Sequence, residues 1–102
     1  MAVEVNWTTL SLEDIENIAS FISKDSEYYA LLQTERFFER AKVLEMYPET
    51  GKIVPEIGSK SIRQLTEGNY RIIYKIISPT RVDILTIHHR SRLLSNNPLF
   101  EE

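Results

Sequence analysis

Residues 61–92 read SIRQLTEGNYRIIYKIISPTRVDILTIHHRSR, and this stretch decides the fold. Apolar β-branched and aromatic residues alternate in it with polar residues, which is the pattern of strands that bury one face. Two groups of turn-forming residues, Thr66-Glu67-Gly68-Asn69 and Ser78-Pro79-Thr80, interrupt the alternation. The stretch therefore predicts three consecutive strands of one antiparallel sheet, over residues 62–65, 70–77 and 81–88.

The turn at Ser78-Pro79-Thr80 sets the expected register of the last two strands. A three-residue turn places Lys75 opposite Asp83, and opposite charges across a ladder favour that pairing. Strict alternation then puts one apolar set toward the helices: Tyr70, Ile72, Tyr74, Ile76, Val82 and Ile84. His88 falls on this face too. The other face mixes apolar and basic residues, which predicts a partly open surface: Arg71, Ile73, Lys75, Leu85, Ile87 and His89.

The N-terminal half predicts one strand and two helices. Residues 2–8 alternate weakly, with Val3, Val5 and Trp7 on one side, as a strand would. A helix follows from an N-cap at Ser11 to about Lys24, because apolar residues recur there at helical spacing.

The second helix is capped by Asp25 or Ser26 and ends before Pro48. We expect its buried stripe to hold Leu31, Thr34, Phe38, Ala41 and Leu44, with Phe37 alongside. The two helices form a hairpin, and residues 49–60 form a loop because they contain Gly51, Pro55 and Gly58.

These elements predict one α+β domain over residues 1–102, in the order β-α-α-β-β-β. The strands form a twisted, mainly antiparallel sheet of four, and the helical hairpin packs on one face. We expect Pro98, Leu99 and Phe100 to fold back onto the core as a C-terminal tail.

Composition excludes several classes of function. The chain has no cysteine, which excludes a disulfide framework and a zinc–thiolate site. Its net charge of −3 argues against a protein that binds nucleic acid mainly through contacts with the phosphates, because proteins of that class are usually basic. The N-terminus does not read as a signal peptide, and no apolar run is long enough to span a membrane. We expect a cytoplasmic protein.

Several short segments, in this order, resemble the RelE/ParE superfamily of toxins from type II toxin–antitoxin modules. The matching segments are the helix end at Leu44 to Pro48, then GKIVPE (residues 51–56), IRQL (62–65), YRIIY (70–74) and the strand that ends at His88, His89, Arg90 and Arg92. The resemblance covers nearly the whole chain. It implies the fold derived above, roles in growth inhibition and plasmid stabilisation, and a labile antitoxin that binds the toxin with an extended, helical segment.

The superfamily has two activities, and the resemblance is closer to the ParE-like branch, whose members catalyse no reaction. ParE-like members inhibit DNA gyrase by binding it, whereas RelE-like and YoeB-like members cut messenger RNA on the ribosome without a metal. A third hypothesis is an inactive member that still binds its antitoxin. The acidic net charge and an incomplete set of nuclease residues favour the gyrase inhibitor.

If the chain is a nuclease, the resemblance to YoeB implies Glu56, Arg71 and a terminal histidine, His89 or His88, as its catalytic residues. They would supply the general acid, general base and cation that RNA cleavage needs. Two departures from the nuclease pattern oppose this: Thr66 stands where RelE has an arginine, and Arg90 stands where YoeB ends in tyrosine.

Each of these residues also has a purely structural interpretation. Arg71 can pair with a loop carboxylate such as Glu56, and His88 can be a hydrogen-bonded histidine at the core edge. Arg63, Arg71, His89, Arg90 and Arg92 together are the expected surface for antitoxin or target. Trp7, Phe37, Phe38, Tyr28 and Tyr29 are expected core and helix-face aromatics, some of them covered by the antitoxin. No cofactor or metal is implied, because adjacent histidines of a strand point to opposite faces.

Overall fold

The computed structural model describes residues 2–100 as a sheet with a helical hairpin on one face. The elements in chain order are β1 (Glu4–Trp7), α1 (Thr9–Ser23), α2 (Glu27–Ala41), the 3-10 turn η1 (Lys42–Glu45), β2 (Lys52–Ile53), β3 (Ile62–Glu67), β4 (Tyr70–Ser78), β5 (Arg81–His89) and the short C-terminal 3-10 turns η2 (Leu94–Asn96) and η3 (Pro98–Phe100). Neither α-helix is long and apolar enough to cross a membrane, nor is any other helix within residues 2–100.

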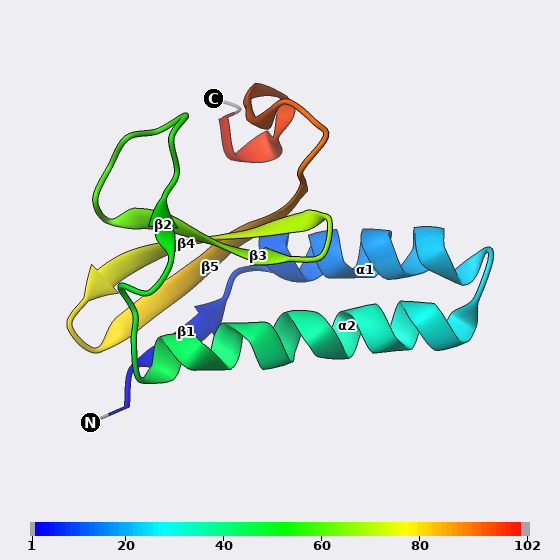
Figure 1. The fold of residues 1–102 in the computed structure, drawn as a ribbon, viewed down its shortest axis with the longest axis horizontal. Helices are drawn as coiled ribbons and strands as arrows, with labels where there is room; N and C mark the ends of the chain where they lie inside the picture. The colour runs from blue at the N-terminus through cyan, green and yellow to red at the C-terminus, as the bar shows by residue number, and fades with distance from the viewer. Residues whose placement is uncertain (1, 101–102) are drawn as a thin grey trace.

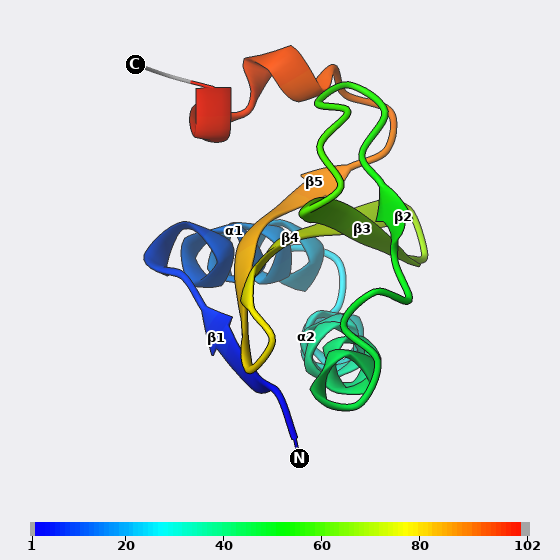
Figure 2. The same ribbon diagram turned by 90° about the vertical axis from the view of Figure 1, so that its left-hand side faces the viewer.

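The sheet is mixed and has the strand order β1-β5-β4-β3-β2 (Figures 1 and 2). The predicted α+β order and the three C-terminal strands are confirmed. The expected count of four strands is wrong, because the segment predicted as a loop contains a fifth strand, β2. Its residues Lys52 and Ile53 pair antiparallel with Gln64 and Arg63 of β3. β1 joins the other edge parallel to β5, so the helical hairpin carries the chain across the sheet.

The first helix begins earlier than its sequence suggests. Thr8 is the N-cap, and its Oγ1 accepts a hydrogen bond from Ser11 N–H at 3.3 Å. The same hydroxyl donates to Ile84 O at 2.6 Å, so the helix start is tied to β5. Ser11, the expected cap, is instead buried in the first turn, where its hydroxyl donates to Thr8 O. A cap bonded to a neighbouring strand is a tertiary contact that local propensity does not report.

The buried face of the second helical segment matches the predicted stripe at Ala41 and Leu44 but not at Leu31 and Phe38. Ser26 is its N-cap, as expected, and its hydroxyl accepts from Tyr29 N–H. Phe37 is fully buried, whereas Leu31 and Phe38 of the predicted stripe are 61% and 38% exposed. Adjacent phenylalanines leave the sequence undecided between two faces that differ by about 100°, and packing selects Phe37.

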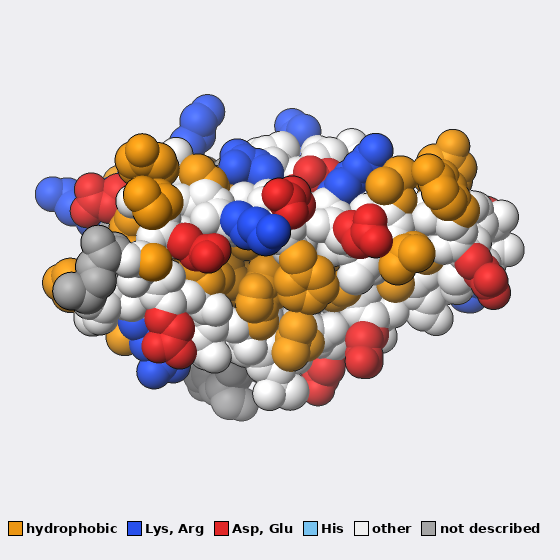
Figure 3. All heavy atoms as spheres, turned by 90° about the horizontal axis from the view of Figure 1, so that it is seen from below, with side chains coloured by type: hydrophobic (Ala, Val, Ile, Leu, Met, Phe, Trp, Pro, Cys, Tyr) orange, Lys and Arg blue, Asp and Glu red, His pale blue; other side chains and the backbone are white. Residues whose placement is uncertain are grey.

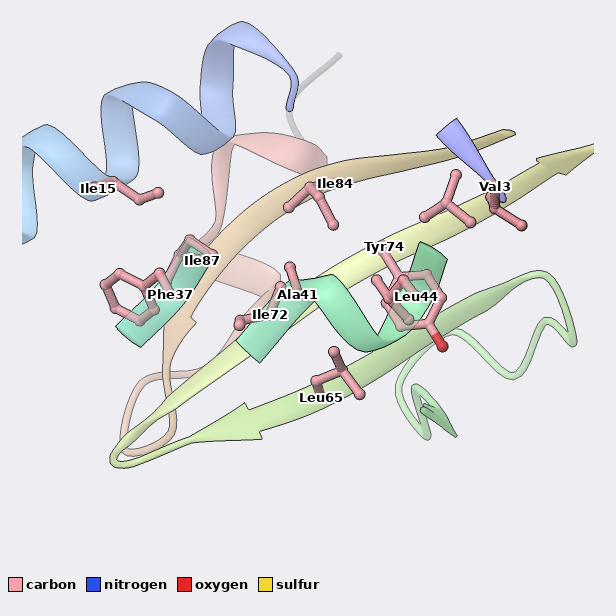
Figure 4. Packing of buried hydrophobic residues seen from close by; sticks show 11 residues of the cluster. Val3, Ile15, Phe37, Ala41, Leu44, Leu65, Ile72, Tyr74, Ile84 and Ile87 are labelled. Atoms are coloured by element: carbon pink, nitrogen blue, oxygen red, sulfur yellow. The ribbon is translucent and has the colours of Figure 1, made fainter. Parts of the chain in front are cut away.

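The main core lies between the hairpin and the sheet. Phe37, Leu44, Tyr74 and Ile84 are among its fully buried members (Figure 4). Tyr74 also uses its hydroxyl, which donates to Pro48 O at 2.7 Å and accepts from Gly51 N–H at 3.0 Å. These two bonds fasten the segment that follows α2 against the sheet.

A β-bulge at Leu85 corrects the predicted faces of β5. Lys75 does lie opposite Asp83, as expected, but Tyr74 pairs with Ile84 while Ile73 pairs with Thr86. Leu85 is thus an extra residue, and the alternation reverses beyond it. Ile87 therefore belongs to the main core, His88 pairs with Arg71, and His89 pairs with Tyr70. The expectation that Ile87 and His89 share the face of Arg71 is wrong.

The face of the sheet opposite the helices is covered in part by two segments, which Figure 2 shows above the strands. Val54 from the loop after β2 and Leu94 from the C-terminal segment are buried against Ile73, and Ile57, Ile62 and Leu85 pack around them. The tail thus folds back, as expected, but of the three expected anchors only Leu99 is partly buried. Pro98 and Phe100 are exposed, and Leu94 and Asn97 are the buried residues.

Candidate functional site

Arg71 projects from β4 onto the sheet face away from the helices and makes three side-chain hydrogen bonds there. Its two terminal nitrogens bind the carboxylate of Glu56 at 2.7 and 2.8 Å, and its Nε donates to Gln64 Oε1 at 2.7 Å. This two-bonded geometry is the strongest form of arginine–carboxylate pair. The predicted pairing of Arg71 with Glu56 is confirmed, and Gln64 is a third member that the sequence did not single out.

The pair changes the acidity of Glu56. Its hydrogen bond to Arg71 lowers the pKa of the Glu56 carboxyl from 4.5 to about 2, although burial acts in the opposite direction. Glu56 is therefore a carboxylate at neutral pH, and an arginine whose side chain is 11% exposed binds it. A guanidinium engaged in this way is a positioning group for the loop and has little freedom to bind a phosphate.

Glu56→Gln is expected to make the stability of the fold depend less on pH at the acid end of the range. A carboxyl with a lowered pKa stabilises the fold above its unfolded value of 4.5, and this contribution is lost as pH falls from 4.5 toward about 2. Solvent screens part of the effect, because the Glu56 side chain is 43% exposed. Thermal unfolding from about pH 7 to about pH 2 should bring the two curves together at the acid end.

The matched control for this measurement is Glu49→Gln, because Glu49 is exposed and makes no ion pair within residues 2–100. Its curve should stay parallel to that of the parent protein. A Glu56→Gln curve equally parallel to the parent would show that the pair with Arg71 contributes nothing to the pH dependence.

His89 lies on the other face of the sheet from Arg71. Its ring stands edge-on to Tyr70, with centroids 5.3 Å apart, and Tyr70 in turn stands edge-on to Phe37. Its Nδ1 accepts hydrogen bonds from the backbone N–H and the hydroxyl of Ser91, at 3.1 and 2.7 Å. The bulge at Leu85 places it there, so the sheet separates His89 from the two other candidate nuclease residues, Arg71 and Glu56.

His88 takes the place beside Arg71 that His89 was expected to occupy. It is buried, and its ring nitrogens contact Asn97 Nδ2 at 3.1 Å and Arg92 O at 3.0 Å. The prediction of a hydrogen-bonded histidine at the core edge is confirmed, although on the opposite face. Asn97 gave no signal in the sequence, because an asparagine in a tail has no pattern that marks it as buried.

Three arginines of the expected partner-binding set remain: the side chain of Arg63 is held by hydrogen bonds, and those of Arg90 and Arg92 are exposed. Arg63 donates to the backbone carbonyls of Lys60, Glu49 and Gly51, and it pairs with Tyr74, on the face opposite Arg71. Arg90 and Arg92 are exposed, and neither makes an ion pair in the described part of the chain. The five expected partner-binding residues therefore do not form one surface. Nor do any three His, Asp or Glu side chains of residues 2–100 gather as a metal ion would require.

Apolar side chains gather on the outer side of the hairpin. Tyr28, Leu31 and Phe38 recur at helical spacing along α2, and all three are exposed; we call them the outer stripe. Trp7 from β1 stands edge-on to Phe38, with centroids 4.7 Å apart. Figure 3 views this side of the molecule and shows hydrophobic groups at the free end of the hairpin and near the middle. Such a surface on a small domain is typical of a partner site.

Comparisons with known proteins agree with this fold. A sequence model of the family described as "ParE toxin of type II toxin-antitoxin system, parDE" matches residues 5–94. A solved chain from the chromosomal ParDE toxin–antitoxin system of P. aeruginosa superposes with a TM-score of 0.71 at 19% identity, and the match covers 86% of this chain and 96% of that one.

A chain of the toxin–antitoxin complex RelBE2 from Mycobacterium tuberculosis is also similar. Its TM-score is 0.57 at 24% identity, over 88% of this chain and 100% of that one. A search of curated sequences found no significant match. At 19% and 24% identity, the similarity to solved structures shows the fold alone. The sequence model of the family matches residues 5–94, and this match shows that the chain is a member of that family. The chain belongs to the ParE toxin family of type II toxin–antitoxin systems.

Proposed function

We propose that this toxin inhibits DNA gyrase by binding it and carries out no bond-making chemistry of its own. One observation carries the proposal: neither candidate histidine is free beside Arg71. His89 lies on the opposite face of the sheet, and His88 is buried with both ring nitrogens in hydrogen bonds. Arg71 is also occupied by Glu56, which a nuclease of this type would need as a free acid or base. The net charge of −3 supports a protein target over RNA. Gyrase as the target implies action in the cytoplasm.

A supercoiling assay tests this proposal directly. Purified toxin is added to gyrase, relaxed plasmid and ATP, and the topoisomers are separated on a gel. We expect supercoiling to be lost, or cleaved plasmid to be trapped, near one toxin per gyrase. Adding the antitoxin in equal amount should restore activity. Full supercoiling at stoichiometric toxin would overturn the proposal, and primer extension on translated messenger RNA would then show whether the chain cuts on the ribosome.

His89→Ala separates the two activities without disturbing the core. General acid or base catalysis contributes about 10²–10⁴-fold, so a nuclease that used His89 would lose most of its growth arrest. For a gyrase inhibitor we expect unchanged growth arrest on induction. Glu35→Ala, at an exposed position of α2, is the expression control. Loss of toxicity with His89→Ala alone, at equal protein level, would support the nuclease.

We further propose that the outer stripe of α2 is covered by the antitoxin. Tyr28 and Leu31 are 68% and 61% exposed, and an apolar row at this spacing fits an amphipathic helix laid alongside. The membership in a toxin–antitoxin family supplies the class of partner. An inactive member would bind the antitoxin in this way yet fail both the supercoiling and the cleavage assay.

A further inference from the structure

A chain of hydrogen bonds runs from α1 through the sheet into the C-terminal segment. Asp14 of α1 contacts the hydroxyl of Thr86 at 2.5 Å and the backbone N–H of Ile87 at 3.0 Å. Asn97 Nδ2 contacts Thr86 Oγ1 and His88 Nδ1, each at 3.1 Å. His88 Nε2 completes the chain at Arg92 O, 3.0 Å away. Thr86, His88 and Asn97 are all buried, so no bulk water substitutes for these bonds.

The groups at the two ends of this series of hydrogen bonds, the Asp14 carboxylate and Arg92 O, determine which atom is the donor in each bond. A carboxylate accepts, so the Thr86 hydroxyl donates its hydrogen bond to Asp14 and has only lone pairs to offer Asn97. Asn97 must therefore present its NH₂ to Thr86, and its second N–H points at His88 Nδ1. Because Arg92 contributes a carbonyl oxygen, His88 Nε2 must carry the hydrogen. His88 is thus held neutral, with its proton on Nε2 and a bare Nδ1.

We propose that this chain of bonds is a pH-sensitive clasp that holds residues 93–100 on the sheet. When His88 gains a second proton, its Nδ1–H meets the N–H of Asn97, and two donors face each other. Turning the Asn97 amide does not repair the contact. Its Oδ1 already accepts from Leu99 N–H at 2.8 Å, and the turned oxygen would face the lone pairs of Thr86.

The charged groups around His88 cannot accept the added proton either. Arg71, its cross-strand neighbour on β4, is itself a cation. Glu56, from the loop after β2, is bound at both oxygens by Arg71. Asp14 of α1 is bound by Thr86 and Ile87, and Arg92 of the tail offers a carbonyl that already has its hydrogen bond. The clasp is therefore closed while His88 is neutral and opens as pH falls, which is the sign expected of a buried neutral histidine.

Opening would have a local effect, because the C-terminal segment is attached at few points. Leu94 is its one fully buried apolar residue, packed with Val54 and Ile73 on the sheet face. Leu93 and Phe100 are 71% and 43% exposed and add little to the attachment. Release of Asn97 would uncover the apolar patch around Ile73 while the main core on the other face stays intact.

Amide hydrogen exchange followed by NMR tests the clasp. Each exchange rate is divided by the intrinsic rate at the same pH, over a series from about pH 8 to about pH 5.5. Protection of Leu99 N–H should fall at least about tenfold, as expected for a lost hydrogen bond, while that of Ile72 in the main core should hold. Parallel changes at both amides, or no change at Leu99, would overturn the proposal.

Two variants distinguish a clasp from simple packing. His89→Gln removes the other histidine and should leave the pH dependence of Leu99 protection intact. His88→Gln should abolish that dependence. Should the His88→Gln protein keep the pH dependence, or should ¹⁵N shifts place the His88 proton on Nδ1 near pH 8, the clasp is ruled out.

Discussion

Phe37→Ala is expected to lower the free energy of unfolding by about 3–5 kcal/mol, a large share of the total for a domain of this size. Phe37 is fully buried and stands edge-on to Tyr70, with ring centroids 5.3 Å apart. Figure 4 shows the ring of Phe37, which comes from α2, lying near Ile87 of β5 and Ile15 of α1. Removing it leaves a cavity between helix and sheet that rigid neighbours cannot fill. Urea unfolding followed by tryptophan fluorescence measures the loss.

Phe38→Ala is the matched control, because it deletes the same side chain one position along the helix. Phe38 is 38% exposed and contacts Trp7, a pair worth about 0.5–1.5 kcal/mol beyond buried area. We expect a small loss of stability and at least a tenfold weaker complex with the antitoxin, about 1.4 kcal/mol. Equal destabilisation by the two substitutions would show that the orientation of α2 is wrong. Unchanged antitoxin affinity would refute the proposed docking on the outer stripe.

Gly51→Ala is expected to cost about 2–3 kcal/mol through overpacking. A Cβ at this buried position would lie 2.5 Å from the Tyr74 hydroxyl oxygen and 2.7 Å from Gln64 O. Neither neighbour can withdraw. Tyr74 is fully buried with its hydroxyl bonded to Pro48 O, and Gln64 O belongs to the backbone of β3. Chemical denaturation of the variant measures the effect.

Two further variants identify the cause of this loss. Gly58→Ala places its Cβ in open space, so its cost is the strain of a φ of +72°, about 1 kcal/mol. Tyr74→Phe removes the nearest clashing atom, so in the Gly51→Ala background it should cost less than it does alone. Additive losses would mean that the Tyr74 hydroxyl is not what excludes a side chain at Gly51.

The predicted register was correct in the middle of the hairpin, where Lys75 lies opposite Asp83 and Ile76 lies opposite Val82. The predicted three-residue turn was wrong, because Ser78 pairs with Arg81, the turn consists of Pro79 and Thr80, and the register shifts between Ile76 and Ser78. The register also failed beyond Leu85, because a bulge inserts one residue without any mark in the sequence. One such residue exchanges the faces of His88 and His89, and with them the meaning of the candidate site.

Among the candidate residues, contacts with complementary charge were easier to predict than contacts with the backbone. The pairing of Arg71 with Glu56 follows from an arginine on an open sheet face and an acid in the neighbouring loop. Arg63 offered the same charge, but it binds three backbone carbonyls on the other face. Asn97 was missed for a similar reason, since its partners come from three separate parts of the chain.

The sequence by itself determined the helical hairpin, the three C-terminal strands and the family, because each follows from short-range periodicity, turn residues and local motifs. Only the tertiary structure decided which phenylalanine of α2 is buried, which histidine stands beside Arg71, and what holds the C-terminal segment. Each of these outcomes depends on a rotation or a shift of one residue. Side-chain packing and buried hydrogen bonds across distant segments discriminate between such alternatives, whereas local propensity is nearly the same for both.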